Sequence, residues 1–214
     1  MKTSLIILLL NLLGYSGAMR ANDDTYSEAM NRRIQTLYSS HSIPTLQDAV
    51  NSLERIGLAE KTKWEPYYYA AFGYIMMADQ ERESHKKDAY LDQAAATIKK
   101  AAAIKVNDSE ITALEGFVHM IRVTVDPASR GQQYSGLAIQ TFGRAISLDP
   151  ENPRALALLA QMQYGTAQFL GSSTLEACST NEAALQKFAA FKSENPLAPR
   201  WGQSMVEGLR AKCK

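Results

Sequence analysis

The side chains with the clearest capacity for chemistry are three histidines, His41, His85 and His119. Glu115 and His119 are four residues apart, so on a helix they share one face and resemble half of a metal site. A zinc site needs three or four ligands and hydrogen-bonded support around them, and no further ligand has suitable spacing. We therefore predict no metal and no cofactor, and we interpret the pair as a surface or interface hydrogen bond.

Catalytic motifs are missing from the sequence. It contains no nucleophile elbow, phosphate-binding glycine loop or calcium loop, so we predict no enzyme and no catalytic residue. The least favoured alternative is an enzyme whose active site lies in the hairpin loops expected at residues 79–88, 125–134 and 169–180. Arg130, in the second of these loops, is expected to pair with an acidic neighbour.

The N-terminus has the layout of a secretory signal peptide. Lys2 precedes an apolar run over residues 5–13, and small residues follow up to Ala18. The run is about half the length that a membrane span requires, about 20 residues. We expect residues 1–21 to be a signal peptide, cut after Ala18 or Ala21, and residues 22–214 to form one exported domain, periplasmic or secreted, with no membrane span.

The charge is balanced, with 23 basic and 22 acidic residues and a net charge of +1. This balance gives no sign of a nucleic-acid partner. The lysine pairs at 86–87 and 99–100 lack the interleaved aromatic residues of a single-strand binding groove, so we interpret them as surface charge.

An internal repeat determines the expected architecture. An alanine begins the same apolar helical pattern at positions 49, 94, 138 and 184, about 45 residues apart. A small residue precedes each copy with the same period, at positions 29, 73, 116 and 160. These series predict an all-α fold: four helix hairpins and a C-terminal capping helix stacked into a right-handed α-α superhelix.

The expected helices follow from hydrophobic periodicity and from prolines at helix starts. Their ranges are 26–39, 45–59, 66–79, 88–105, 109–124, 134–148, 153–168, 181–193 and 200–212.

One segment carries a family resemblance. Residues 142–153 read FGRAISLDPENP, which resembles the end of a tetratricopeptide repeat. In that family a small residue of the first helix packs against an alanine of the second, as Gly116 and Ala138 would here. The spacing between such residues is 20 to 24 here, against roughly 12 in an ordinary repeat of about 34 residues. The difference predicts lengthened loops inside the hairpins, all on one edge.

Shorter segments resemble one subfamily of exported tetratricopeptide-like proteins of Gram-negative bacteria. They are WEPYYY at 64–69, DPASRG at 126–131, NPR at 152–154 and LAPRWG at 197–202. This subfamily has no assigned activity, so the resemblance implies a fold and a compartment only.

The aromatic run over residues 64–74 suggests a binding surface, because its members cannot all face one neighbouring helix. In tetratricopeptide-like arrays the first helix of each hairpin lines a concave groove, and aromatic, Met and Arg side chains favour recognition there. The residues predicted to line this partner-binding groove are Tyr67, Tyr74, Met77, Glu110, Phe117, Met120, Arg154, Gln161 and Tyr164. The alternative is that helices and loops bury them as core.

The favoured function is therefore a non-enzymatic, exported helical-repeat scaffold that binds a protein or peptide partner in the cell envelope. The alternative is a periplasmic small-molecule or glycan binding protein, with the groove and long loops enclosing the ligand. A closed apolar pocket with a few convergent polar groups would favour that alternative.

The two cysteines, Cys178 and Cys213, are 35 residues apart. Cys178 falls in the last expected hairpin loop, and the terminal helix is expected to run back to the same edge. In an oxidising compartment the two thiols are therefore candidates for a disulfide that holds the capping helix. One buried and one free thiol is the alternative.

Overall fold

The computed structural model describes residues 24–213, and this part of the chain is helical with no strand. A first helix covers residues 24–39. It is followed by α2 (Ile43–Ala59), α3 (Glu65–Gln80), α4 (Ser84–Ile104), α5 (Ser109–Val123), α6 (Pro127–Leu148), α7 (Pro153–Leu170), α8 (Leu175–Ala190) and α9 (Gln203–Arg210). The predicted signal peptide lies outside the described residues. None of the described helices is long and apolar enough to cross a membrane.

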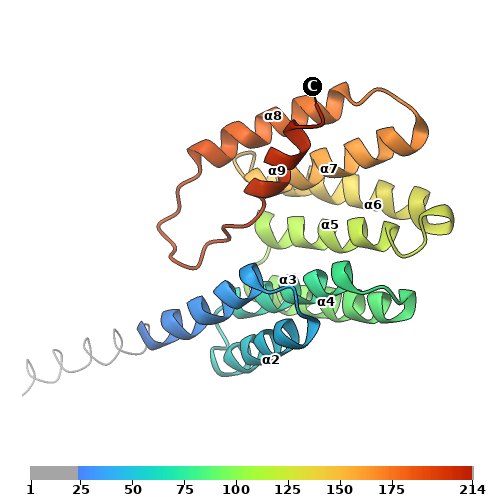
Figure 1. Cartoon of the computed structure of the whole chain (residues 1–214). Helices are drawn as coiled ribbons and strands as arrows, with labels where there is room; N and C mark the ends of the chain where they lie inside the picture. The colour runs from blue at the N-terminus through green and yellow to red at the C-terminus, as the bar shows by residue number, and fades with distance from the viewer. Residues whose placement is uncertain (1–23, 214) are drawn as a thin grey trace, which may run out of the picture.

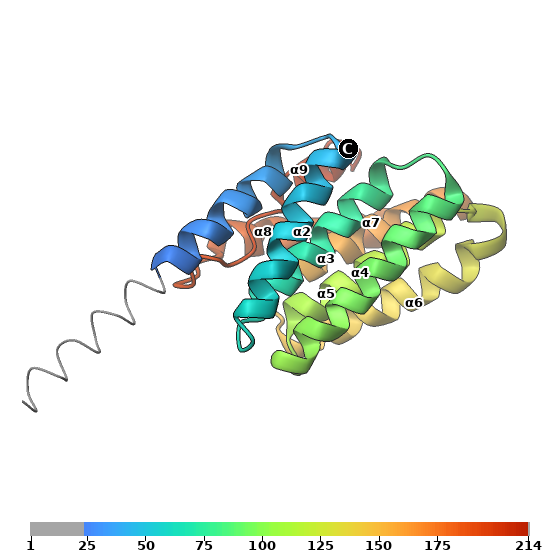
Figure 2. The same cartoon turned by 90° about the horizontal axis from the view of Figure 1, so that it is seen from below.

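The helices stack as an α-α superhelix, the predicted fold class (Figure 1). Each helix from α2 onward packs on its neighbour in sequence, and α5 also contacts both α3 and α7. These three helices therefore form an inner layer, while α4, α6 and α8 lie outside it. Figure 2 shows the helices side by side, with the chain from residue 191 onward folded back across the array.

Proline and short polar side chains fix several helix starts. Pro127 and Pro153 stand in the first turns of α6 and α7, where a missing N–H costs no hydrogen bond. The side chain of Asn152 accepts hydrogen bonds from the N–H groups of Arg154 and Ala155, which caps α7. Asn152 is itself 2% exposed, so this cap also fixes the position of the buried Arg154.

The predicted lengthened loops were wrong. The connections inside the four hairpins are short, at residues 40–42, 81–83, 124–126 and 171–174. Residues expected in loops instead extend α4, α6 and α8 at their N-termini. The extra spacing between the small residue and the alanine is therefore taken up by additional helical turns, which satisfy more backbone hydrogen bonds than a loop would.

The hairpin connections do lie on one edge of the array, as predicted. The Ser84 hydroxyl donates to the carbonyl of Val125 at 3.4 Å, which joins the second and third hairpins. The Asp88 carboxylate pairs with Arg122 at 3.0 Å and with Arg130 at 2.7 Å. The expected pairing of Arg130 is thus confirmed, and its hydrogen bond lowers the pKa of Asp88.

Close packing inside the third hairpin explains one of the repeated small residues. A Cβ atom at Gly116 would lie 2.4 Å from Cε1 of Phe142, which is far inside van der Waals contact. Phe142 lies one helical turn beyond Ala138, and both are fully buried. Glycine at position 116 therefore lets the α5 backbone approach the ring on α6.

A disulfide joins Cys178, in α8, to Cys213, just after α9, with Cα atoms 5.6 Å apart. The bridge expected from the sequence is therefore present in the structure, although Cys178 lies in a helix rather than a loop. It ties the terminal helix to the last hairpin.

Replacing both cysteines by serine is expected to lower the free energy of unfolding by up to about 3–4 kcal/mol, because the cross-link restricts the unfolded chain. Urea unfolding of the oxidised wild type and the double variant measures the difference. If the single-serine variants lose stability and the double variant does not, the loss comes from a disturbed site and not from the missing cross-link.

Candidate functional site

The inner face of the array is covered by the chain itself. The segment from Phe191 to Gly202 turns back from the end of α8 to the start of α9 (Figure 1), and hydrogen bonds fix it to α3 and to the first helix. The Tyr69 hydroxyl donates to the carbonyl of Leu197 at 2.8 Å, and the backbone N–H of Arg200 donates to the Tyr38 hydroxyl at 3.2 Å. The position of a bound peptide in an open array is thus occupied by residues 191–202.

Trp201 is the main anchor of this segment. Its ring lies between Phe72 and Phe117, with centroid distances of 5.1 and 5.8 Å and interplanar angles of 24°. Its indole N–H donates to the hydroxyl of the fully buried Tyr68 at 3.0 Å. Burial, followed by the charge of Glu110, raises the pKa of Tyr68 well above its usual value, so this hydroxyl stays protonated.

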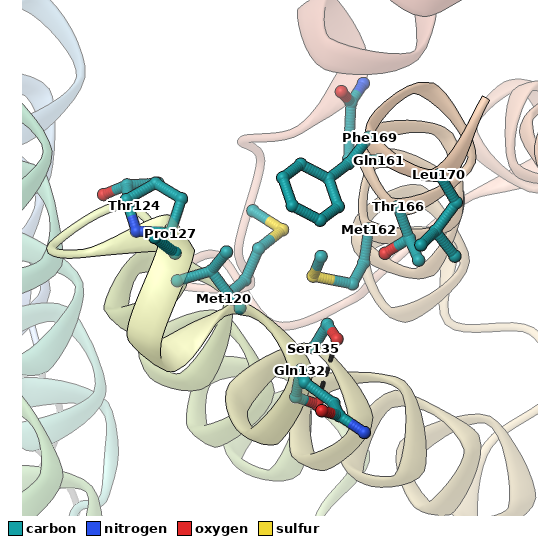
Figure 3. Close-up of a pocket in the computed structure, with 14 residues that line it drawn as sticks. Met120, Thr124, Pro127, Gln132, Ser135, Gln161, Met162, Thr166, Phe169 and Leu170 are labelled. Carbon is teal, nitrogen blue, oxygen red and sulfur yellow. Dashed lines mark hydrogen bonds between the residues drawn. The ribbon is translucent and has the colours of Figure 1, made fainter.

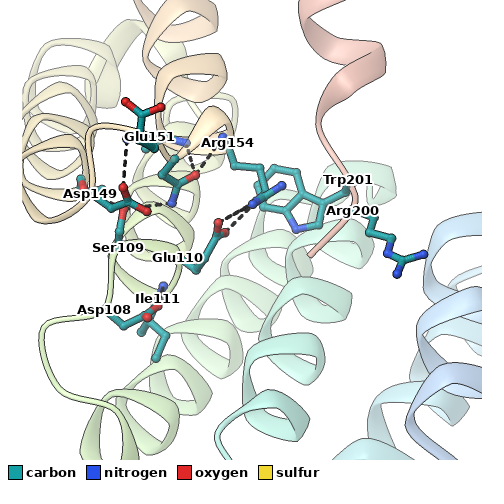
Figure 4. Close-up of polar contacts among 12 residues, drawn as sticks. Asp108, Ser109, Glu110, Ile111, Asp149, Glu151, Arg154, Arg200 and Trp201 are labelled. Atoms are coloured by element: carbon teal, nitrogen blue, oxygen red, sulfur yellow. Dashed lines mark hydrogen bonds and ion pairs between the residues drawn. The ribbon is translucent and has the colours of Figure 1, made fainter. Parts of the chain in front are cut away.

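A buried ion pair lies beside Trp201 (Figure 4). The Arg154 side chain is 1% exposed, and its Nε and Nη2 donate to the carboxylate of Glu110 at 2.6–2.9 Å. The Tyr68 hydroxyl donates to the same carboxylate at 3.3 Å. Together these contacts connect α3, α5 and α7 beneath the segment 191–202.

The nine residues predicted to line a groove occupy three kinds of environment. Five are buried: Tyr67, Tyr74, Met77, Phe117 and Arg154. Glu110 is held by Arg154, and Tyr164 lies under the amine of Lys212, 5.9 Å from its ring centre. Met120 and Gln161 line a pocket. Partner binding by the nine residues stays a prediction.

The pocket, with a volume of about 720 Å³, lies on the edge where the hairpins turn (Figure 3). The end of α5, the start of α6 and the second half of α7 form its walls. Its lining residues are mostly apolar: Met120, Val123, Thr124, Pro127, Ala128, Gly131, Gln132, Ser135, Gln161, Met162, Gly165, Thr166, Phe169 and Leu170.

The mouth of the pocket is apolar and open. Phe169 and Leu170, adjacent at the end of α7, are 76% and 68% exposed. Two glycines, Gly131 of α6 and Gly165 of α7, line the pocket, and no atom lies within 4 Å of a Cβ placed on either. No side chain therefore fills the pocket at these two positions.

Polar chemistry in the pocket is limited to neutral groups and two thioethers. Met120 and Met162 direct their sulfur atoms toward the cavity from opposite walls (Figure 3). His119 precedes Met120 but is not part of the lining; it stacks on Tyr134, and burial lowers its pKa. Across residues 24–213, no three His, Cys, Asp or Glu side chains form a group suited to a metal ion.

Much of this pocket was missed in the sequence, for a physical reason. Phe169 and Leu170 follow the helical pattern of α7 and are indistinguishable from core residues until their neighbours are known. One signal in the sequence could have indicated the pocket. The regions expected to be loops, 125–134 and 169–180, contain many of the lining residues.

A comparison with solved structures finds that the chain is similar to the HusA haemophore from Porphyromonas gingivalis. The two chains are 29% identical, with a TM-score of 0.78, and the match covers 88% of this chain and 92% of the haemophore. No family model matches the sequence, and no curated protein matches it. The structural neighbour is a binding protein rather than an enzyme, and its fold is the same helical array.

Proposed function

We propose that this protein is an exported binding protein for haem or a related porphyrin, which it holds in the pocket between α5, α6 and α7. The pocket carries the proposal. Its volume of about 720 Å³ falls in the range of small-molecule sites, roughly 300–1,000 Å³. Its apolar walls suit a flat, largely apolar ring, and the likeness to a haemophore names a ligand of that shape.

The polar side chains of the pocket and its opening to solvent suit the carboxylates of such a ligand. A porphyrin of the haem type has two carboxylates on one side of the ring, and the pocket is open to solvent on one side. Gln132 and Ser135 on α6 and Gln161 and Thr166 on α7 are neutral hydrogen-bonding groups at the walls. We expect the ring to enter with its carboxylates toward solvent, because burying them without partners would be costly.

The scaffold function is less well supported by the fold. A peptide partner on the inner face would have to displace residues 191–202, including the stacked Trp201. A loop-borne active site has little support as well. Asp88, which was expected at the end of the first loop and lies in α4, has a lowered pKa because it is held in an ion pair with Arg130. Small-molecule binding therefore describes the site better than either alternative.

The test is a titration of the mature chain with haem, followed by absorbance in the Soret region and by quenching of protein fluorescence. We expect saturation at one haem per chain. A signal that rises without saturation, or that saturates at several haems per chain, would mean adsorption to exposed apolar surface and would remove support for the proposal.

Metal-free protoporphyrin is expected to bind within about tenfold of haem. No His, Cys, Tyr or carboxylate is found among the residues that line the pocket, so the thioethers of Met120 and Met162 are the side chains that would be left to ligate a haem iron. Most of the affinity must then come from the ring. The same fluorescence titration measures both ligands, and a preference for haem of more than about 100-fold would contradict this expectation.

A further inference from the structure

The walls of the pocket between α5, α6 and α7 carry no charged side chain, because the hydrogen-bonding side chains that line it are hydroxyls and amides. A porphyrin of the haem type brings two negative charges. Charged groups at the rim therefore decide how well the pocket suits such a ligand. The hairpin edge beside the pocket, at residues 81–88 and 122–130, contains several of them.

Several charged groups on this edge have partners of opposite sign. Asp88 binds the guanidinium groups of Arg122 at 3.0 Å and Arg130 at 2.7 Å. Lys86 is paired with Glu83. These groups neutralise one another and leave little charge to attract a ligand.

Two further carboxylates on the edge hold backbone N–H groups. Asp126 accepts the N–H of Ser129 at 3.2 Å and so caps α6. Glu81 accepts the N–H groups of Arg82 and Glu83 at 2.7 and 3.0 Å. Both carboxylates are therefore engaged by the chain ends that they cap.

Lys87, in the first turn of α4, differs from these groups, because its partner is neutral and lines the pocket. Its ammonium donates to the Thr124 hydroxyl at 3.2 Å. That hydroxyl gives its own proton to the carbonyl of Ile121 at 2.8 Å, so its oxygen is free to accept from Lys87. An ammonium has three donors, and Lys87 forms no ion pair within residues 24–213. It therefore keeps donors for a ligand.

Thr124 marks one end of the pocket. Figure 3 shows it beside Pro127, on the other side of the cavity from Leu170. Thr124 is exposed and Lys87 is half-buried, so a carboxylate at this end stays in contact with water. This position agrees with a ring that enters with its carboxylates toward solvent.

We propose that Lys87 determines which porphyrins the pocket prefers: its ammonium binds one ring carboxylate at the Thr124 end, so porphyrins with carboxylates bind more tightly than neutral ones. This inference rests on the proposed function. A point charge on a flexible stem suits the task, because it can follow a flexible ring substituent. The pair is partly exposed, so we expect it to contribute about three- to fivefold in affinity.

The test compares protoporphyrin with its diamide, in which neutral carboxamides of the same shape replace both carboxylates. Each is titrated into the mature wild-type protein and into Lys87→Gln, and protein fluorescence is followed. We expect Lys87→Gln to weaken protoporphyrin binding about three- to fivefold and to leave diamide binding unchanged. Glutamine keeps a donor for Thr124 but has no charge, so the variant should fold.

The matched control is Lys99→Gln, an equal charge change on the same helix. Lys99 is exposed and lies twelve residues further along α4, about 18 Å away. At physiological ionic strength a charge at that distance is screened. We therefore expect both affinities to stay at the wild-type values, and thermal melts check that both variants are folded.

The possible failures are distinguishable. The assignment of Lys87 is overturned if Lys87→Gln weakens both ligands equally, if it weakens neither, or if Lys99→Gln causes the same loss of protoporphyrin affinity. Each of these results leaves porphyrin binding itself intact. A wild-type protein that binds neither ligand would overturn the proposed function, and this inference with it.

Discussion

Replacing Gly165 by leucine is expected to lower porphyrin affinity about 10- to 100-fold without loss of stability. A Cβ at this position meets no atom within 4 Å, and the position lines the pocket, so the leucine side chain extends into the space that the ring needs. Overpacking of a filled site costs about 1–3 kcal/mol. Because glycine inside a helix is unfavourable by about 1 kcal/mol relative to good helix formers, α7 itself should become slightly more stable.

The matched control is Gly136→Leu in α6. Gly136 also has no atom within 4 Å of an added Cβ, but it is exposed and does not line the pocket. Porphyrin titrations and thermal melts of the two variants compare the effects directly. Wild-type affinity in the Gly165→Leu protein would mean that the ligand binds elsewhere.

The second large effect is expected from Trp201→Ala, which should destabilise the protein by about 3–5 kcal/mol, as truncation of a buried aromatic residue does. The substitution removes the ring between Phe72 and Phe117 and leaves the Tyr68 hydroxyl without its indole donor. Urea unfolding measures the loss.

Phe169→Ala provides the contrast, because this ring is 76% exposed and lines the pocket. It should leave the free energy of unfolding nearly unchanged and reduce porphyrin affinity. If Trp201→Ala costs less than about 1 kcal/mol, the segment 191–202 is not a firmly packed part of the fold.

The helical array was predictable because its signal is local and repeated. Gly73 and Gly116 mark close helix contacts, and the structure places Val50 against Gly73 and Phe142 against Gly116. The disulfide was also predictable, since both cysteines lie near one edge of the last hairpin. These features follow from periodicity and from the direction of successive helices.

The filled inner face was not predictable in the same way. Trp201 was expected inside a helix beginning at residue 200, whereas α9 begins at Gln203 and Gly202 adopts a φ of 103°. The ring partners of Trp201 lie in α3 and α5, more than 80 residues earlier in the chain. No periodic pattern encodes such a contact, so the aromatic residues of α3 looked available to a partner.

The most direct test of porphyrin binding in this pocket uses the methionine methyl groups. Met120 and Met162 lie on opposite walls of the pocket, whereas Met30 and Met77 are buried in the core. With methyl-labelled methionine, a bound diamagnetic zinc porphyrin is expected to shift the resonances of Met120 and Met162 strongly upfield through its ring current and to leave the two core methyls nearly unchanged. Saturable porphyrin binding without shifts at Met120 and Met162 would contradict the account.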